Sequence, residues 1–173
     1  MIYDCIIIGG GPAGLLASLK ASEKGGTVAV IERNNILGKK LRITGKGRCN
    51  ITNDCDFDTL MANIPGNPKF LFSAFKNFSN LDIIDFFNDI GLETVTERGG
   101  RVFPKSQKAG DVAGALVSQV KKRNNISLYM NTYVKDILIE DGCAKGVAVN
   151  DKDGNSFEIL SQNVICATGG LSY

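Results

Sequence analysis

The stretch Ile2–Gly14, with the sequence IYDCIIIGGGPAG, determines how the rest of the chain can fold. Its first part, Ile2–Ile8, is an apolar run, which is typical of a central parallel strand buried on both faces. A helix is expected after the glycines, over about Pro12–Lys24, and the β-branched segment Thr27–Glu32 is expected to be a second strand. This strand–helix–strand beginning predicts a parallel sheet with a right-handed crossover.

The residues from Gly9 to Gly14 follow the pattern GxGxxG, which by itself is weak evidence for a nucleotide site. Its context strengthens it, because Glu32 lies 18 positions after Gly14, close to the spacing of about 20 expected for a ribose-binding carboxylate. We expect Gly9 to permit the tight turn, Gly11 to let a pyrophosphate approach the backbone, and Gly14 to let helix and strand pack closely. The N–H groups and partial positive charge at the helix N-terminus favour phosphate.

Glu32 also restricts which nucleotide fits. Its carboxylate would repel a 2′-phosphate, so NADP is disfavoured, while FAD and NAD both remain open. If Glu32 binds the ribose hydroxyls, Glu32→Ala should weaken FAD binding by about 1.5–3 kcal/mol. The melting temperature of the FAD-free chain should then change little. A glycine turn that binds no ligand is the competing interpretation, but strand, helix and carboxylate at these spacings favour the nucleotide.

Beyond Glu32, the pattern predicts helices inserted after the second strand and then a three-stranded meander. The expected elements are a polar loop over 33–54, a helix beginning near Asn67, a helix over 79–91, a hairpin over 92–103, a helix over 110–123, a parallel strand over 126–130, meander strands over 133–140, 145–149 and 156–160, and a last parallel strand over 163–167. The first inserted helix should bury Phe70, Leu71, Phe75 and Phe78. The fold class is therefore α/β, a Rossmann-like parallel sheet with a β-meander crossover and helical insertions after strand two.

A basic, glycine-rich segment follows the second strand. Residues 38–53 read GKKLRITGKGRCNITN and hold five Lys and Arg side chains among glycines, hydroxyls and amides. Such a loop can bind the phosphates or the far part of a long cofactor. The competing interpretations are a solvated loop and a nucleic-acid patch, and the absence of aromatic residues from the segment weakens the second. Cys49 beside Arg48 could be a redox thiol, but a small residue near a flavin or in a turn is the favoured interpretation.

Composition excludes several classes of protein. The chain has five cysteines, no histidine and no CxxC motif, which argues against a disulfide framework or a metal site and favours a reducing cytoplasm. A net charge of +2 gives no reason to expect nucleic acid or a membrane as partner. No apolar run approaches the roughly 20 residues that span a bilayer.

Five segments together make the chain resemble the BaiN-like, aminoacetone-oxidase-like family of FAD-dependent oxidoreductases. They are GGGPAG at 9–14, ERN at 32–34, GKKLRITGKGRCNITN at 38–53, RVFP at 101–104 and ATGG at 167–170. The part TGKGRCNITN is specific to that family, whereas GxGxxG and ATG are shared by the wider glutathione-reductase-like flavoproteins. The resemblance runs along the whole chain but covers only the front part of the family's pattern.

The resemblance implies a set of cofactor-binding residues. The glycine motif would bind the pyrophosphate, Glu32 the adenosine ribose, the basic loop the flavin side, Val134 the adenine, and the final ATG a second flavin contact. The implied residues are Gly9, Gly11, Pro12, Ala13, Gly14, Glu32, Arg33, Lys40, Arg42, Thr44, Gly45, Gly47, Arg48, Cys49, Asn50, Val134, Ala167, Thr168 and Gly169. No catalytic acid or base is identified.

The resemblance implies FAD as cofactor, NAD(P)H as electron donor and a small-molecule substrate that the sequence does not identify. Residues 1–173 would form the N-terminal portion of an FAD-binding domain. Family members continue into a substrate domain and a C-terminal flavin-binding segment, so we expect this chain alone to bind FAD weakly and to have little activity. Two alternatives remain open: an NAD-binding module of a dehydrogenase, and a non-catalytic nucleotide- or RNA-associated flavoprotein domain.

Overall fold

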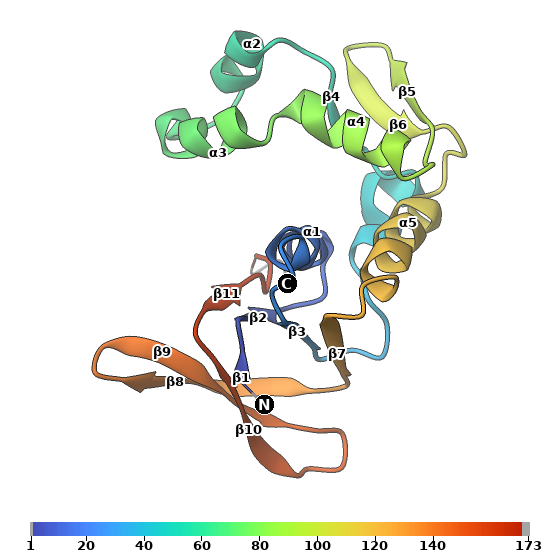
Figure 1. Cartoon of the computed structure of the whole chain (residues 1–173). Coiled ribbons are helices and arrows are strands. Elements are labelled where there is room, and N and C mark those ends of the chain that lie inside the picture. The colour runs from blue at the N-terminus through green and yellow to red at the C-terminus, as the bar shows by residue number, and fades with distance from the viewer. Residues whose placement is uncertain (1, 171–173) are drawn as a thin grey trace. The chain divides into compact units, whose positions relative to one another are not determined.

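The computed structural model describes residues 2–170 and divides into two compact units (Figure 1). Unit 1 comprises residues 1–40 and 116–173, and unit 2 comprises residues 41–115. Unit 1 contains the glycine motif and the parallel sheet, and unit 2 contains most of the basic loop and the inserted helices.

The parallel sheet of unit 1 has the strand order β11-β2-β3-β7. Its strands are β11 (Val164–Cys166), β2 (Cys5–Ile8), β3 (Val28–Glu32) and β7 (Ile126–Met130), and every neighbouring pair is parallel. Helix α1 (Pro12–Ser22) connects β2 to β3. The predicted strand–helix–strand beginning and the Rossmann-like sheet are therefore confirmed.

The first strand is interrupted at Asp4, so the prediction of one strand over Ile2–Ile8 is wrong. Residues Ile2–Tyr3 form β1, which pairs with β10 (Ser156–Ser161) in a different sheet from β2. The Asp4 Oδ2 atom accepts hydrogen bonds from the Thr27 N–H (2.7 Å) and the Thr27 hydroxyl (2.9 Å). These bonds fix the chain where it passes from one sheet to the other.

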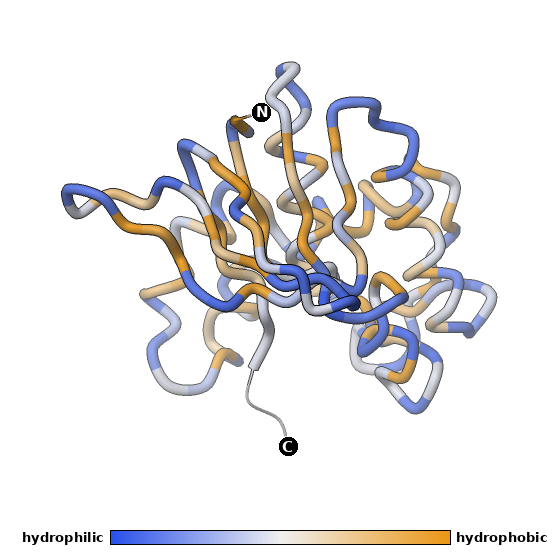
Figure 2. The backbone as a smooth tube through the Cα atoms, turned by 90° about the horizontal axis from the view of Figure 1, so that it is seen from below, coloured by the Kyte–Doolittle hydropathy of each residue, from blue (hydrophilic) through white to orange (hydrophobic). Residues whose placement is uncertain are grey.

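The meander forms the second sheet of unit 1, in the order β1-β10-β9-β8. Strands β8 (Tyr133–Glu140), β9 (Cys143–Asn150) and β10 pair antiparallel, as predicted, while β1 joins β10 in parallel. Hydrophobic residues lie along the strands and hydrophilic residues at the turns between them (Figure 2).

Alternate residues of the parallel sheet face two different layers. On one face, the side chains of β2 and β3 pack against Ala17 and Ala21 of α1. On the other face they pack against the meander. This second core consists of Tyr3, Ile6, Ile8, Ala29, Ile31, Val147, Val149 and Ile159. Unit 1 thus has three layers, and burial on both faces explains why β2 and β3 contain continuous apolar runs.

Unit 2 is built around a small antiparallel sheet in the order β4-β6-β5. The strands are β4 (Thr52–Asn53), β5 (Thr94–Glu97) and β6 (Arg101–Pro104), and the hairpin between β5 and β6 is the one predicted. The helical elements are η1 (Leu41–Gly47), α2 (Phe57–Ala62), η2 (Pro68–Leu71), α3 (Phe72–Asn77), α4 (Asn80–Asp89) and the first part of α5 (Ala109–Lys121). Ser79 and Asp82 form a capping box at the start of α4.

The predicted helix beginning near Asn67 is broken into η2 and α3. Because the 3₁₀ turn of η2 rotates side chains by about 120° per residue, the helical pattern does not hold across it. Phe70, which we expected to be buried, is 82% exposed, so that prediction is wrong. Helix α2 was not predicted; it begins after Asp56, whose side chain caps it by accepting the Thr59 N–H. Among residues 2–170, no helix is long and apolar enough to cross a membrane.

Candidate cofactor-binding site

The glycine turn, residues Gly9–Gly14, brings backbone atoms closer together than side chains would permit. Gly9 has a φ of +112° and donates its N–H to the Ile31 carbonyl at 2.8 Å. A Cβ on Gly9 would lie 2.4 Å from the Ala167 carbonyl oxygen, and a Cβ on Gly14 would lie 1.9 Å from the Gly9 carbonyl oxygen. Both glycines are therefore required by the fold itself, whether or not a ligand binds.

Gly11 is different, because nothing lies within 4 Å of the position that its Cβ would take. It is the N-cap of α1, and the helix has no side-chain cap. Pro12 has no N–H, and within residues 2–170 the N–H groups of Gly11, Ala13 and Gly14 have no hydrogen-bond acceptor. Open backbone and unpaired donors at the positive end of a helix dipole fit a pyrophosphate group.

Glu32, at the end of β3, is 8% exposed and is bonded to the protein itself. Its Oε2 accepts the Gly10 N–H at 2.8 Å, and its Oε1 accepts the backbone and side-chain N–H groups of Asn34 at 2.8 and 2.6 Å. The carboxylate therefore ties β3 to the glycine turn. Each carboxylate oxygen can accept two hydrogen bonds, so Oε2 still has capacity for a ribose hydroxyl. The expectation that the FAD-free chain hardly depends on Glu32 conflicts with these bonds.

Two further segments meet the same edge of the parallel sheet. Before Val134, the Thr132 N–H bonds to the Glu32 carbonyl (3.0 Å) and the Asn131 N–H to the Asn34 carbonyl (3.2 Å). Val134 itself lies half-buried in β8, packed against the meander core. After β11, the Ala167 N–H bonds to the Ile8 carbonyl at 2.8 Å.

Unit 1 thus brings the glycine turn, Glu32, the segment before Val134 and Ala167 together at the carboxyl ends of the strands. Ligands bind at this edge in open α/β sheets. Thr168 and Gly169 follow Ala167 and are exposed, as is Arg33 after β3.

The left-handed loop, residues Leu41–Asn50 of unit 2, is named for its backbone. Gly45, Lys46, Gly47 and Cys49 have φ values of +55°, +57°, +86° and +60°. The turn is closed by the Cys49 N–H to the Thr44 carbonyl at 3.1 Å, and the Thr44 hydroxyl bonds to the Leu41 carbonyl at 2.7 Å. For the non-glycine residues Lys46 and Cys49 this conformation costs on the order of 1–3 kcal/mol each. It persists only because other contacts determine it.

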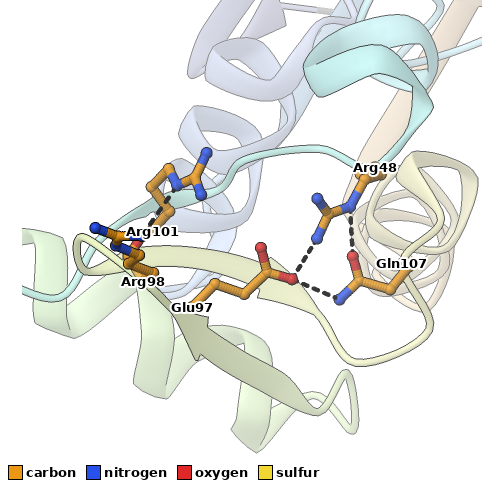
Figure 3. A network of polar contacts seen from close by, with 5 residues as sticks. All are labelled: Arg48, Glu97, Arg98, Arg101 and Gln107. Atoms are coloured by element: carbon orange, nitrogen blue, oxygen red, sulfur yellow. Dashed lines mark hydrogen bonds and ion pairs between the residues drawn. The ribbon is translucent and has the colours of Figure 1, made fainter.

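Arg48 is held by three side chains in unit 2, of which Figure 3 shows Glu97 and Gln107. Its Nε donates to the Gln107 Oε1 at 2.5 Å, its Nη2 forms an ion pair with the Glu97 Oε1, and its guanidinium carbon lies 4.1 Å from the centre of the Phe103 ring. Gln107 Nε2 also donates to Glu97 Oε1 at 3.4 Å. The cation is thereby fixed against the β5–β6 hairpin and the turn that follows it.

The other residues of the left-handed loop have mixed surroundings. Cys49 is 2% exposed, and burial raises the pKa of its thiol, opposed by a hydrogen bond with the Thr44 side chain. A protonated, buried thiol supports the turn role over a redox nucleophile. Arg42 has a buried Nε without an acceptor among residues 2–170. The Asn50 amide lies 3.2 Å from the Val102 carbonyl and 3.0 Å from that of Thr52, and donates to both.

Sequence reasoning missed the residues that hold the predicted ones in place. Glu97 and Gln107 lie 49 and 59 positions from Arg48, and no local pattern links them. Asn34 belongs to the ERN segment at 32–34, but no contact was predicted for it. Its position two residues after Glu32 suits a turn in which the carboxylate accepts from the amide. Among residues 2–170, no group of three or more His, Cys, Asp or Glu side chains could hold a metal ion.

Comparison with known proteins identifies the family. The profile of the HI0933-like protein Rossmann domain matches residues 3–173. The chain is 32% identical over 167 residues to 3-dehydro-bile acid delta(4,6)-reductase of Clostridium scindens, which covers 95% of this chain and 38% of that protein. It is 31% identical over 170 residues to ribosomal RNA dihydrouridine synthase of Escherichia coli, which covers 98% of this chain and 40% of that protein. The chain therefore spans about two fifths of the length of these relatives.

The fold is also found in solved structures. The crystal structure of 3-ketosteroid delta1-dehydrogenase from Sterolibacterium denitrificans superposes with a TM-score of 0.78 at 16% identity, over 98% of this chain and 48% of that one. This likeness concerns the fold alone. The α/β Rossmann prediction and the family resemblance are both confirmed. The chain belongs to the HI0933-like Rossmann domain family, which includes the BaiN-like FAD-dependent oxidoreductases, and FAD is the cofactor of this family.

Proposed function

We propose that the whole protein is an FAD-dependent reductase, and that unit 1 binds the adenosine diphosphate half of FAD. One observation carries this proposal: the open backbone at Gly11, where the first amides of α1 have no acceptor among residues 2–170, lies in the same turn that Glu32 holds through Gly10. A pyrophosphate needs the first feature and an unphosphorylated ribose the second. In this proposal Val134 meets the adenine, and residues 1–173 form the N-terminal portion of an FAD-binding domain.

The remaining predicted residues are proposed to serve the flavin half of FAD. By family resemblance these are Arg33, Lys40, Arg42, Thr44, Gly45, Gly47, Arg48, Cys49 and Asn50, together with Ala167, Thr168 and Gly169. When bound, FAD supplies the two-electron chemistry, and the protein's part is to bind, orient and tune it. Lys and Arg side chains in the loop can offset the negative charge of a bound cofactor.

For the substrate, we propose a carbon–carbon double bond conjugated to a carbonyl group. The reactions that give the two relatives their names support this class of substrate. A delta(4,6)-reductase of a 3-dehydro-bile acid acts on double bonds conjugated to a ketone. A dihydrouridine synthase saturates the uracil double bond next to a ring carbonyl. Such a reduction adds a hydride to one carbon and a proton to the other, with NAD(P)H proposed as the source of the electron pair.

The likeness to an RNA-modifying enzyme makes RNA a second candidate substrate, against our expectation of no nucleic-acid partner. A net charge of +2 and the absence of aromatic residues from the basic loop favour a small molecule. We therefore propose a small enone-type substrate, and treat a uracil within RNA as the competing outcome of the test.

The test uses the whole protein. Cofactor released by denaturation should be FAD, and anaerobic NADH or NADPH should bleach the flavin absorbance. Reoxidation of the bleached enzyme should then be fast with a conjugated 3-oxo-steroid and slow with its saturated analogue. Recovery of NAD alone would overturn the flavin proposal in favour of a dehydrogenase module. Reoxidation by ribosomal RNA fragments with formation of dihydrouridine, and none by enones, would establish the RNA substrate instead.

A further inference from the structure

We propose that Glu97 and Gln107 are positioning residues, which hold the Arg48 guanidinium so that its remaining N–H donors bind the electron-rich pyrimidine edge of the flavin. This inference rests on the proposed function, because it takes the left-handed loop to serve the flavin half of FAD. It adds two residues, from β5 and from the turn after β6, to which no cofactor role is otherwise assigned.

The arrangement around Arg48 is more than a surface ion pair. An ordinary pair is present in the same hairpin region, where Lys105 bonds to Glu93 at 2.5 Å with side chains 65% and 72% exposed. The Arg48 and Glu97 side chains are only 39% and 32% exposed. In addition, Gln107 binds a second guanidinium nitrogen and also donates to Glu97. The two acceptors fix the orientation of the Arg48 guanidinium within its plane, and the Phe103 ring covers one face of that guanidinium.

The backbone gives independent support. Gln107 has a φ of +61°, a conformation that non-glycine residues seldom adopt. At the other end of the contact, Arg48 lies between Gly47 and Cys49, which both have positive φ. Strain at Gln107, and at Cys49 beside Arg48, indicates that the contact between Arg48 and Gln107 is maintained despite a conformational cost.

The network leaves donor capacity unused. A guanidinium carries five N–H groups, and Arg48 uses one on Nε and one on Nη2. The three that remain, two of them on Nη1, have no acceptor among residues 2–170, and the side chain is partly exposed. A fixed, incompletely paired guanidinium is suited to a planar acceptor that carries negative charge. The pyrimidine edge of a flavin is planar, presents carbonyl oxygens, and gains negative charge on reduction.

The experiment compares four variants of the whole protein: Arg48→Ala, Glu97→Gln, Gln107→Ala, and Glu93→Gln as the matched control from the exposed pair. FAD dissociation constants are measured by fluorescence quenching. We expect Arg48→Ala to weaken binding by about 10- to 100-fold, the range for losing hydrogen bonds from a charged donor. Glu97→Gln and Gln107→Ala should weaken it by about 3- to 10-fold, and Glu93→Gln should have no effect.

Double variants separate positioning from other roles. In an Arg48→Ala background, Glu97→Gln and Gln107→Ala should have no further effect on FAD binding, because they act through Arg48. Additive losses would overturn the proposal. Thermal melting of the FAD-free proteins identifies any variant that fails to fold, in which case the other member of the Glu97–Gln107 pair provides the test.

The sign of the change in flavin reduction potential distinguishes a direct electrostatic effect of Glu97 from an effect through Arg48. Glu97→Gln removes a negative charge, so a direct electrostatic effect would make the potential more positive. Loss of Arg48 positioning would instead make it more negative, as Arg48→Ala itself should, because the negative charge of the reduced flavin would lose its partner. A positive shift for Glu97→Gln, or unchanged FAD binding in Arg48→Ala, would refute the inference while the FAD proposal stands. A wild-type protein that binds no FAD would refute both.

Discussion

The glycine turn and the left-handed loop both depend on glycine, but for different physical reasons. In the turn, Gly9 and Gly14 are needed because a Cβ would collide with backbone carbonyl oxygens at 2.4 and 1.9 Å. In the loop, a Cβ on Gly45 would lie 2.8 Å from the Asn50 nitrogen, but nothing lies within 4 Å of the position of a Gly47 Cβ, where the requirement comes from φ alone. Close packing of main chain therefore dominates in the turn, whereas positive φ values dominate in the loop.

This difference determines which substitutions each region tolerates. Close main-chain contacts leave no freedom to substitute Gly9 or Gly14, so these positions are visible in the sequence as a motif. The left-handed loop places Lys46 and Cys49 where glycine would be less strained, and depends on Glu97, Phe103 and Gln107 to keep its shape.

The largest effect should come from adding a methyl group within the turn. Gly14→Ala should destabilise the FAD-free chain by at least about 3 kcal/mol, because its Cβ would lie 1.9 Å from a carbonyl oxygen that cannot move without distorting the turn. Gly11→Ala is the matched control: with open space around it and a φ of −79°, it should change stability by no more than about 0.5 kcal/mol. Urea denaturation measures both.

The same control tests the proposed binding site. Gly11→Ala should weaken FAD binding by about tenfold or more, because its methyl group would occupy the space assigned to the pyrophosphate. If FAD affinity were unchanged, the open backbone at Gly11 would not be the place where the cofactor binds. If Gly14→Ala folded with normal stability, close packing would not be what determines the turn.

Glu32 should give an intermediate effect that links structure and binding. Glu32→Ala leaves the buried Gly10 N–H without an acceptor and releases Asn34, which should cost the FAD-free chain about 2–3 kcal/mol. Glu32→Gln keeps one carbonyl oxygen for the Gly10 N–H and should cost about 1 kcal/mol. Equal urea midpoints for wild type and Glu32→Ala would restore the simpler view, in which this carboxylate serves only the ribose.

Local patterns predicted the parts of the fold that depend on local chemistry. The apolar runs of β2 and β3, the glycine turn and the β5–β6 hairpin each depend on a few adjacent residues. The split at Asp4 was not predictable, because it requires Thr27 to provide two donors from a different element. Phe70 was misplaced because a 3₁₀ turn and a helix beginning with Asn-Pro look alike in sequence.

The candidate site divides in the same way. GxGxxG, Glu32 and ATG lie at a single sheet edge. Spacing alone indicated GxGxxG and Glu32, whereas ATG was assigned by resemblance. The left-handed loop could be named only by resemblance, since its basic residues are equally compatible with a solvated surface. Its partners in unit 2 became visible only when the chain was folded, because contacts over 49 and 59 residues leave no periodic signal.

The smallest expected effect reverses the sign of the first. Lys46 is exposed and has a φ of +57°, so Lys46→Gly should relieve conformational strain. The gain from a positive φ is on the order of 1–2 kcal/mol, and the greater freedom of glycine in the unfolded chain offsets part of it. We expect a net stabilisation of about 0.5–1 kcal/mol by urea denaturation. Lys46→Ala is the control, because it removes the charge but keeps the Cβ, and it should not stabilise the chain. Stabilisation by both variants would assign the effect to charge repulsion among the basic residues of the loop. In that case the contrast would no longer hold between a turn that is destabilised by an added methyl group and a loop that is stabilised by removal of a side chain.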